Sequence, residues 1–145
     1  MPQLKQNADA SMGIQGSDGD DGSFIKASIL WNANVNTSGA FLTVSTHVFA
    51  RRMIVKSITY VNDTAATNAV TATVFRAPSA TALGSGTALH SGTANLQATA
   101  GANNTLTLAI NSTLDIAAGT RIGLVISGAP GAAGVGCITV TLAPA

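Results

Sequence analysis

The sequence contains no glutamate, one cysteine, one tryptophan and one tyrosine in its 145 residues. The single cysteine, Cys137, excludes a disulfide within the chain. No stretch approaches the ~18 consecutive apolar residues of a transmembrane helix, so we expect no membrane span. The first residues also lack the apolar core of a secretory signal peptide, and we expect no secretion by that route.

Charge is scarce as well. Charged residues make up 9% of the chain, against roughly 25% in an average soluble protein. A small monomer with so few charges and so much apolar sequence lies close to aggregation. One solution is to bury part of the surface against copies of itself or a large partner. An ordinary sandwich covered in Thr, Ser and Asn is the alternative.

The C-terminal third consists of alternating runs. Every second residue is large and apolar in residues 106–110, 122–126 and 138–142. A period of two places those side chains on one face of a β-strand. Turn-forming residues fill 111–120 and 128–136, which separate the runs. The pattern predicts antiparallel strands joined by short loops.

The rest of the body continues this pattern. Residues 53–62 are apolar in both phases, which predicts a central strand or one lying under a subunit contact. No helix is expected, and regularly spaced short strands favour an all-β fold: a single antiparallel β-sandwich over residues 24–145, jelly-roll-like, with about eight strands. The other expected strands are 24–34, 41–49, 69–77 and, less regular, 87–90 and 94–99.

Residues 1–23 have no periodicity and are rich in glycine. Such a segment buries too little apolar surface to offset its ordering entropy, so we expect an extended or disordered N-terminal arm. The arm carries a net charge of −3, with Asp18, Asp20 and Asp21 close together, whereas the body carries +4. The arm could therefore pack on its own body, on a neighbouring subunit or on another protein.

Residues that could support catalysis are few. Asp63 and Asp115 are the only carboxylates outside the arm, in turn-like positions, and no Gly-x-Ser-x-Gly elbow accompanies His47 and His90. We interpret both histidines as polar surface residues and expect no enzyme. The segment 17–23 resembles a calcium loop superficially but lacks the acidic spacing and closing glutamate of an EF-hand. We therefore expect no metal and no cofactor.

One basic cluster is present, formed by Arg51, Arg52 and Lys56. Nucleic-acid binding usually needs a larger basic patch and exposed aromatic residues, and aromatic residues are only 4% of this chain. We therefore expect no nucleic-acid partner. The cluster is interpreted as a salt-bridging or solvated pair at a strand start, or as a contact with an acidic partner surface. Together with Asp18, Asp20 and Asp21 it forms our set of candidate capsid or subunit contacts.

Three segments resemble small structural proteins of tailed bacteriophages: residues 77–97, Leu114-Asp-Ile-Ala-Ala-Gly-Thr-Arg-Ile-Gly-Leu124 and Gly136-Cys-Ile-Thr-Val-Thr-Leu-Ala-Pro144. The Ala-Ala-Gly-Thr-Arg segment resembles the turn before a strand in many jelly rolls, where a glycine relieves the tight bend, a role that Gly119 would fill. Family members usually have aspartate after that glycine, where this chain has Thr120. The resemblance covers residues 55–145 and leaves out the arm.

The resemblance implies a virion protein, and among these we favour a head decoration, or cement, protein. Such a protein binds the major capsid protein on the outer capsid surface as a homo-oligomer, here expected to be a trimer. The main alternative is a tail or head-fibre module that binds a host glycan through an exposed Trp31 or Tyr60. Trp31 shares its phase with Ile25 and Ile29, which favours a core position instead. A secreted lectin or TNF-like trimer is disfavoured by the missing signal peptide.

Overall fold

The computed structural model describes residues 24–32, 41–48, 51–128, 131 and 133–145, and their regular structure is almost entirely β. The predicted arm lies outside these residues, so its extended form stays a prediction. Within them, no helix is long and apolar enough to cross a membrane. The strands and 3-10 turns of the described residues are β2 (Ile25–Asn32), β3 (Phe41–Val48), β4 (Met53–Thr64), β5 (Thr71–Ala77), η1 (Leu83–Ser85), β6 (Thr87–Ala88), β7 (Ala94–Asn95), β8 (Asn103–Thr105), η2 (Asn111–Thr113), β9 (Asp115–Ile116), β10 (Arg121–Ser127) and β11 (Val135–Pro144).

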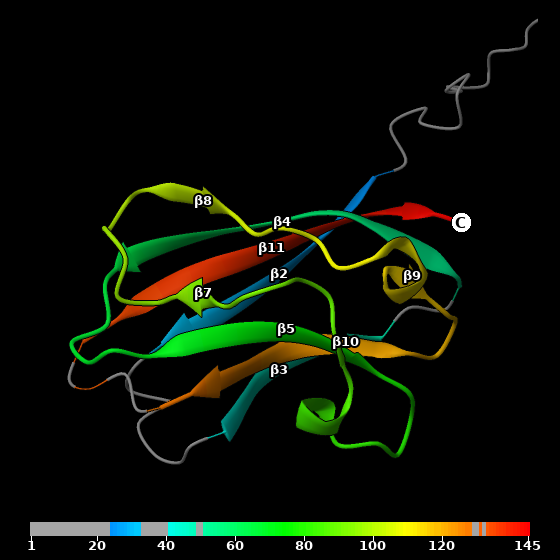
Figure 1. Ribbon diagram of the computed structural model, residues 1–145, viewed down its shortest axis with the longest axis horizontal. Helices are drawn as coiled ribbons and strands as arrows, with labels where there is room; N and C mark the ends of the chain where they lie inside the picture. Colours follow the sequence, from blue (N-terminus) through cyan, green and yellow to red (C-terminus); the bar gives the residue numbers. More distant parts are fainter. Residues whose placement is uncertain (1–23, 33–40, 49–50, 129–130, 132) are drawn as a thin grey trace, which may run out of the picture.

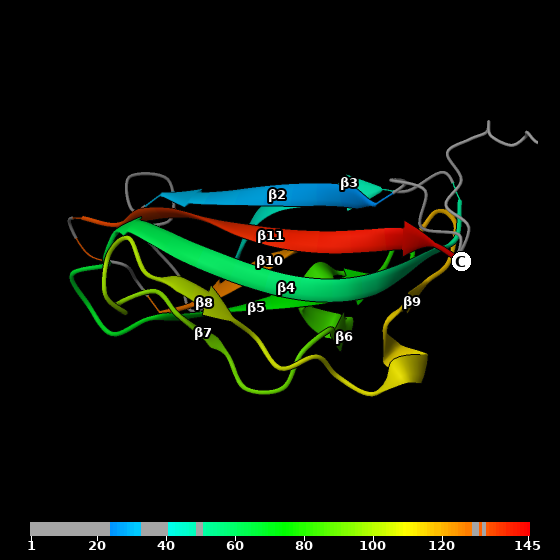
Figure 2. The same ribbon diagram turned by 90° about the horizontal axis from the view of Figure 1, so that it is seen from above.

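The strands form two antiparallel sheets that pack as a β-sandwich (Figure 1), which confirms the predicted fold class. One sheet has the order β2-β11-β4-β8, with β9 also paired to β4. The other has the order β3-β10-β5-β6, with β7 also paired to β5. Figure 2 shows β2, β11 and β4 side by side in their layer. Strands β2 to β5 alternate between the sheets, and β10 and β11 then insert between earlier strands, which is the wrapping of a jelly roll.

The inward side chains of both sheets form one apolar core. The alternation in 122–126 and 138–142 is confirmed, because the apolar residues of both runs are buried. Trp31 is 1% exposed and lies in this core, as its phase predicts. Each large apolar side chain removed from water in this way stabilises the fold by roughly 1.5–3 kcal/mol. The largest fully buried side chains are Trp31, Ile29, Met53, Ile58, Leu89, Leu96, Ile116, Ile122, Leu124, Ile126, Ile138 and Leu142.

A β-bulge explains why the sequence of β4 is apolar in both phases. Thr141 of β11 pairs with Ser57, but the next residue of β11 pairs with Val55, so Lys56 is one residue extra. Such an insertion reverses the side on which the following side chains point. Met53 and Val55 therefore face the core before the bulge, and Ile58 faces it afterwards. The prediction of a central strand is confirmed, since β4 lies between β11 and the short strands β8 and β9.

The run 106–110 is not the strand that its alternation predicts. The paired strand, β8, comes earlier, and Leu108 makes only an isolated bridge with His90. Leu106 is buried, Leu108 is half-buried at the edge of the core, and Ile110 is 75% exposed. Alternation was a poor guide here because this segment bows away from β4 and pairs with no long strand.

Asn62 is a buried polar residue of the central strand. It lies within β4 and is fully buried, and its side-chain Nδ2 donates hydrogen bonds to the carbonyl oxygens of Asn95 (3.1 Å) and Ala98 (3.2 Å). A buried amide needs such partners to offset its lost hydration. Asn62 thus fixes the loop after β7 to the central strand.

The tight bend before β10 is made at Gly119. Gly119 has a φ of +80°, a conformation that favours glycine. The amide of Thr120 donates to the carbonyl of Ala117 at 3.0 Å, which closes the turn. Thr120 itself is buried.

Candidate functional site

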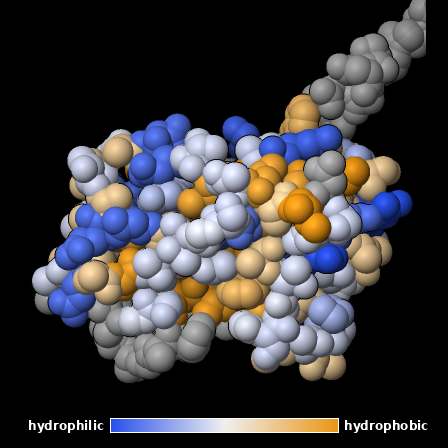
Figure 3. Space-filling model, in the orientation of Figure 1, coloured by the Kyte–Doolittle hydropathy of each residue, from blue (hydrophilic) through white to orange (hydrophobic). Residues whose placement is uncertain are grey.

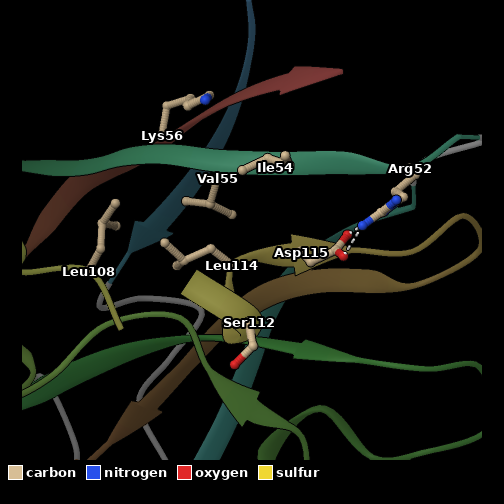
Figure 4. A pocket seen from close by; sticks show the side chains of 8 residues that line it. All are labelled: Arg52, Ile54, Val55, Lys56, Leu108, Ser112, Leu114 and Asp115. Carbon is tan, nitrogen blue, oxygen red and sulfur yellow. Dashed lines mark hydrogen bonds and ion pairs between the residues drawn. The ribbon is translucent and has the colours of Figure 1, made fainter. Parts of the chain in front are cut away.

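A groove of about 580 Å³ lies between the start of β4 and the segment that leads into β9 (Figure 4). β4 supplies one wall, and the chain from Leu108 to Asp115 supplies the other. Figure 3 shows apolar surface beside hydrophilic residues at the end of the molecule where β9 lies in Figure 1. The lining residues are Arg52, Ile54, Val55, Lys56, Leu108, Ser112, Leu114 and Asp115.

The backbone explains why the groove forms. The amide of Leu106 donates to Ile58 at 2.9 Å, and the amide of Val55 donates to Leu114 at 3.0 Å. Between these two anchors the intervening chain bows away from β4, and it does so beside the bulge at Lys56. The floor is apolar because Val55 and Leu114 point inward toward the core.

One end of the groove is closed by an ion pair. Arg52 donates from Nε to Oδ1 of Asp115 (2.9 Å) and from its second nitrogen to Oδ2 (2.5 Å), a bidentate arrangement. The guanidinium holds the pKa of Asp115 below its ordinary value, mainly through these hydrogen bonds. Arg76 donates to the backbone carbonyl of Asp115 at 2.8 Å. Two arginines thus converge on one carboxylate-bearing residue, and positive charge remains in excess.

Positive charge gathers at the same end of the sandwich. The first residue of β2, Ile25, pairs with Leu142, which pairs in turn with Val55. Lys26 therefore lies across β11 from the bulge that carries Lys56, and both side chains are exposed. Asp63 lies seven residues further along β4, roughly 20 Å away. The cations described at the groove end are Lys26, Arg51, Arg52, Lys56, Arg76 and Arg121, and Asp115 is the carboxylate among them.

The structure brings together part of the predicted contact set. Arg52 and Lys56 both line the groove, and Arg51 is exposed beside them. The salt-bridging interpretation is confirmed for Arg52. The predicted contacts Asp18, Asp20 and Asp21 lie outside the described residues. The sequence analysis missed Asp115 as a member of this site, because 63 residues separate it from Arg52 and no local pattern links the two.

A second surface is the outer face of the sheet β2-β11-β4-β8. Leu30, Cys137 and Val61 form one row across three strands, and Leu30 is 67% exposed. These three residues, with Val135 and others, line a shallow depression of about 340 Å³. Hydroxyl side chains form the next rows, and they come from Ser28, Thr139, Thr59, Thr105, Thr141 and Ser57. Among the described residues of this face, charge occurs only near its two ends, where Lys26 and Asp63 lie.

Both aromatic residues that a glycan platform would use are buried. Trp31 is 1% exposed and Tyr60 is 7% exposed. The Tyr60 hydroxyl accepts a hydrogen bond from the amide of Asn95 at 3.3 Å, so its polar end is engaged within the fold. Neither ring can stack on a sugar without unfolding its strand.

His90 is not the surface residue that we expected. It is 4% exposed, and its Nε2 accepts a hydrogen bond from the amide of Val74 at 3.0 Å. Nε2 must therefore be unprotonated, which leaves the proton on Nδ1. Burial lowers the pKa of His90 below its ordinary value of 6.5, although nearby backbone carbonyls oppose the shift. The side chain of His47 lies outside the described side chains, and in the described part of the chain no three His, Cys or Asp residues gather as a metal site.

We expect the free energy of unfolding to fall as the pH drops through about 6.5. Below this pH the unfolded chain binds a proton at His90 that the folded protein excludes. The stability that neutral His90 contributes is therefore complete above a pH of about 6.5, and it is lost as the pH falls from there to the lower pKa of His90 in the folded protein. Urea unfolding between pH 7.5 and pH 5 measures the effect. His90→Gln keeps an acceptor but does not titrate, so its stability should change less over this range. An equal loss in both proteins would contradict the assignment.

Comparison of the chain with models of protein families, with curated proteins and with solved structures gave no match.

Proposed function

We propose that this protein is a capsid decoration, or cement, protein of a tailed bacteriophage virion. In this role it binds the major capsid protein on the outer head surface as a homo-oligomer, a trimer, and stabilises the shell. The assignment to a phage virion rests on the sequence resemblance, and the mode of action is inferred from the surface of the sandwich.

The observation that carries the proposal is the outer face of the sheet β2-β11-β4-β8. Between Lys26 at one end and Asp63 at the other, its rows hold apolar and hydroxyl side chains from four strands. A broad, nearly uncharged sheet face with an exposed leucine is well suited to burial against another protein, because little charge has to be desolvated. This supports an assembly protein over a freely diffusing monomer.

Shell stabilisation follows from mass action. A protein that binds the assembled capsid and not its dissociated subunits shifts the equilibrium toward the shell. Differential scanning calorimetry of capsids with and without the protein tests this role, and equal melting temperatures would remove it. Quantitative mass spectrometry of purified virions gives the copy number. A fixed, high ratio to the major capsid protein supports decoration, whereas a few copies per particle would favour the tail or fibre alternative.

Leu30→Asp should weaken capsid binding at least about tenfold, because binding would bury an unpaired carboxylate on the proposed contact face. Leu30 is 67% exposed in the single chain, so the fold should be retained. Binding is measured by co-sedimentation with capsids that lack the protein, and the oligomeric state by light scattering.

Ala82→Asp is the matched control for this charge. Ala82 is exposed on the segment that covers the outer side of the other sheet, where Leu83 packs on Ala77 and Val125. The control should bind and assemble as the native protein does. Equal binding by native protein and both variants would show that the face around Leu30 makes no contact.

A further inference from the structure

The two parts of the chain have opposite charge. Residues 1–23 carry −3, with three of their aspartates within residues 18–21, and the body carries +4. In the described body the cations cluster at the groove end, and Asp115 is already held by Arg52. The exposed cations Arg51, Lys56 and Lys26 have no carboxylate of the described body beside them in an ion pair. The most acidic segment of the chain therefore complements this end.

The position at which the arm joins the sandwich brings the two together. β2 begins at Ile25, two strands from Val55 in the groove wall. Two inter-strand spacings amount to roughly 10 Å. Asp21 comes four positions before Ile25 and Asp18 comes seven positions before it, and these lengths of chain can span up to about 14 Å and about 25 Å. The acidic segment of a given chain can thus reach the basic groove of that same chain.

The groove also fits the segment chemically. The match is at its rim, where the ammonium of Lys56 and the guanidinium of Arg52 can pair with carboxylates. In Figure 4, Lys56 stands on the opposite side of β4 from Val55. Glycines alternate with the aspartates at positions 19 and 22. Glycine lets a backbone approach a surface closely, so carboxylates on both sides of it can reach cations.

We propose that the basic groove beside β4 is the docking site for residues 18–21 of the chain's own arm. The short tether gives the arm a local concentration in the millimolar range, far above that of free copies in dilute solution. Each exposed ion pair is weak, so docking is reversible and sensitive to salt. The inference does not depend on the proposed function, because it concerns the protein alone in solution.

Paramagnetic NMR tests the proposal. The full chain carries Cys137→Ser and a spin label on Ser17→Cys, and line broadening is measured on the backbone amides of Lys56, Leu108 and Asp115. In the matched variant, Asp18→Asn, Asp20→Asn and Asp21→Asn keep the tether and the label but remove the charge. We expect the ratio of docked to undocked arm to fall about fivefold in this variant. Salt at about 0.5 M should reduce the broadening in the charged protein alone.

A mixed sample separates the possible occupants. Isotope-labelled protein without a spin label is combined with spin-labelled protein without isotope. Docking of a chain's own arm predicts no broadening in this mixture, and broadening there would overturn the proposal in favour of a neighbour's arm. Equal broadening by the charged and neutral arms in the single-chain experiment would overturn it too, since the tether alone would then explain proximity. The double variant Arg51→Glu and Lys56→Glu should lose docked arm, and with it line broadening, as the neutral-arm variant does. It leaves the ion pair of Arg52 with Asp115 intact.

Discussion

Leu124→Ala lowers the free energy of unfolding by about 2–5 kcal/mol. Leu124 is fully buried in β10, opposite Val74 of β5, at the centre of the core between the two sheets. β10 is covered on both sides, since Val125 packs beneath the segment around Leu83. The strand therefore has little freedom to move into the space that a lost side chain would leave. Urea unfolding followed by the fluorescence of the buried Trp31 measures the loss.

Leu108→Ala and Ile110→Ala provide the matched comparison, because all three residues occupy alternating positions in apolar runs. Leu108 is half-buried at the groove, so its truncation should cost clearly less than that of Leu124. Ile110 is 75% exposed, and its truncation should change stability by no more than about 0.5 kcal/mol. A loss at Leu108 equal to that at Leu124 would contradict the burial described for the groove.

These three residues also mark how far alternation predicts the fold. Alternation predicted a strand correctly where that strand lies between two long strands of its sheet, as do β10 with Leu124 and β11 with Val140. There the buried face extends along the whole strand, and the period of two follows directly. At Leu108 and Ile110 the chain has no long partner, so the same pattern produces a segment that bows away from the sheet.

The bulge in β4 shows a second limit. The sequence predicted a central strand from apolar residues in both phases, and this was right, but the cause is one extra residue at Lys56. A bulge is defined by its register with the partner strand, which no local pattern contains. Likewise the burial of Asn62 depends on carbonyl acceptors more than 30 residues away in the sequence, which no local pattern contains.

The candidate site was predictable only in its cations. Arg51, Arg52 and Lys56 are close in sequence, and the structure keeps them at one end of the molecule. Asp115 and the apolar floor come from a segment that the fold brings to β4 through long-range pairing. His90 was misassigned because its burial depends on a hydrogen bond that its ring accepts from the amide of Val74 on a neighbouring strand, and no local pattern around His90 contains that contact.

Gly136→Ala should destabilise the protein by about 3 kcal/mol or more, the upper end of what overpacking costs. Gly136 lies in β11 between Trp31 of β2 and Asn62 of β4. A Cβ at this position would lie 2.5 Å from the carbonyl oxygen of Val61 and 2.6 Å from the indole nitrogen of Trp31. One of these atoms belongs to the backbone of the central strand, which cannot move without breaking its own pairing. Only the missing side chain leaves room for the indole nitrogen beside β11.

Gly84→Ala is the control, since nothing lies within 4 Å of the added carbon there and its stability should be nearly unchanged. Circular dichroism follows both variants, so the test does not depend on the tryptophan. The double variant with Trp31→Phe then separates the two clashes. If the indole is the main obstacle, Gly136→Ala costs less when phenylalanine is present, and the two substitutions couple. If the carbonyl of Val61 dominates, the cost is the same in either background, because the β4 backbone stays where it is. A Gly136→Ala variant as stable as Gly84→Ala would mean that β11 and β4 can separate locally without loss, contrary to the tight pairing described here.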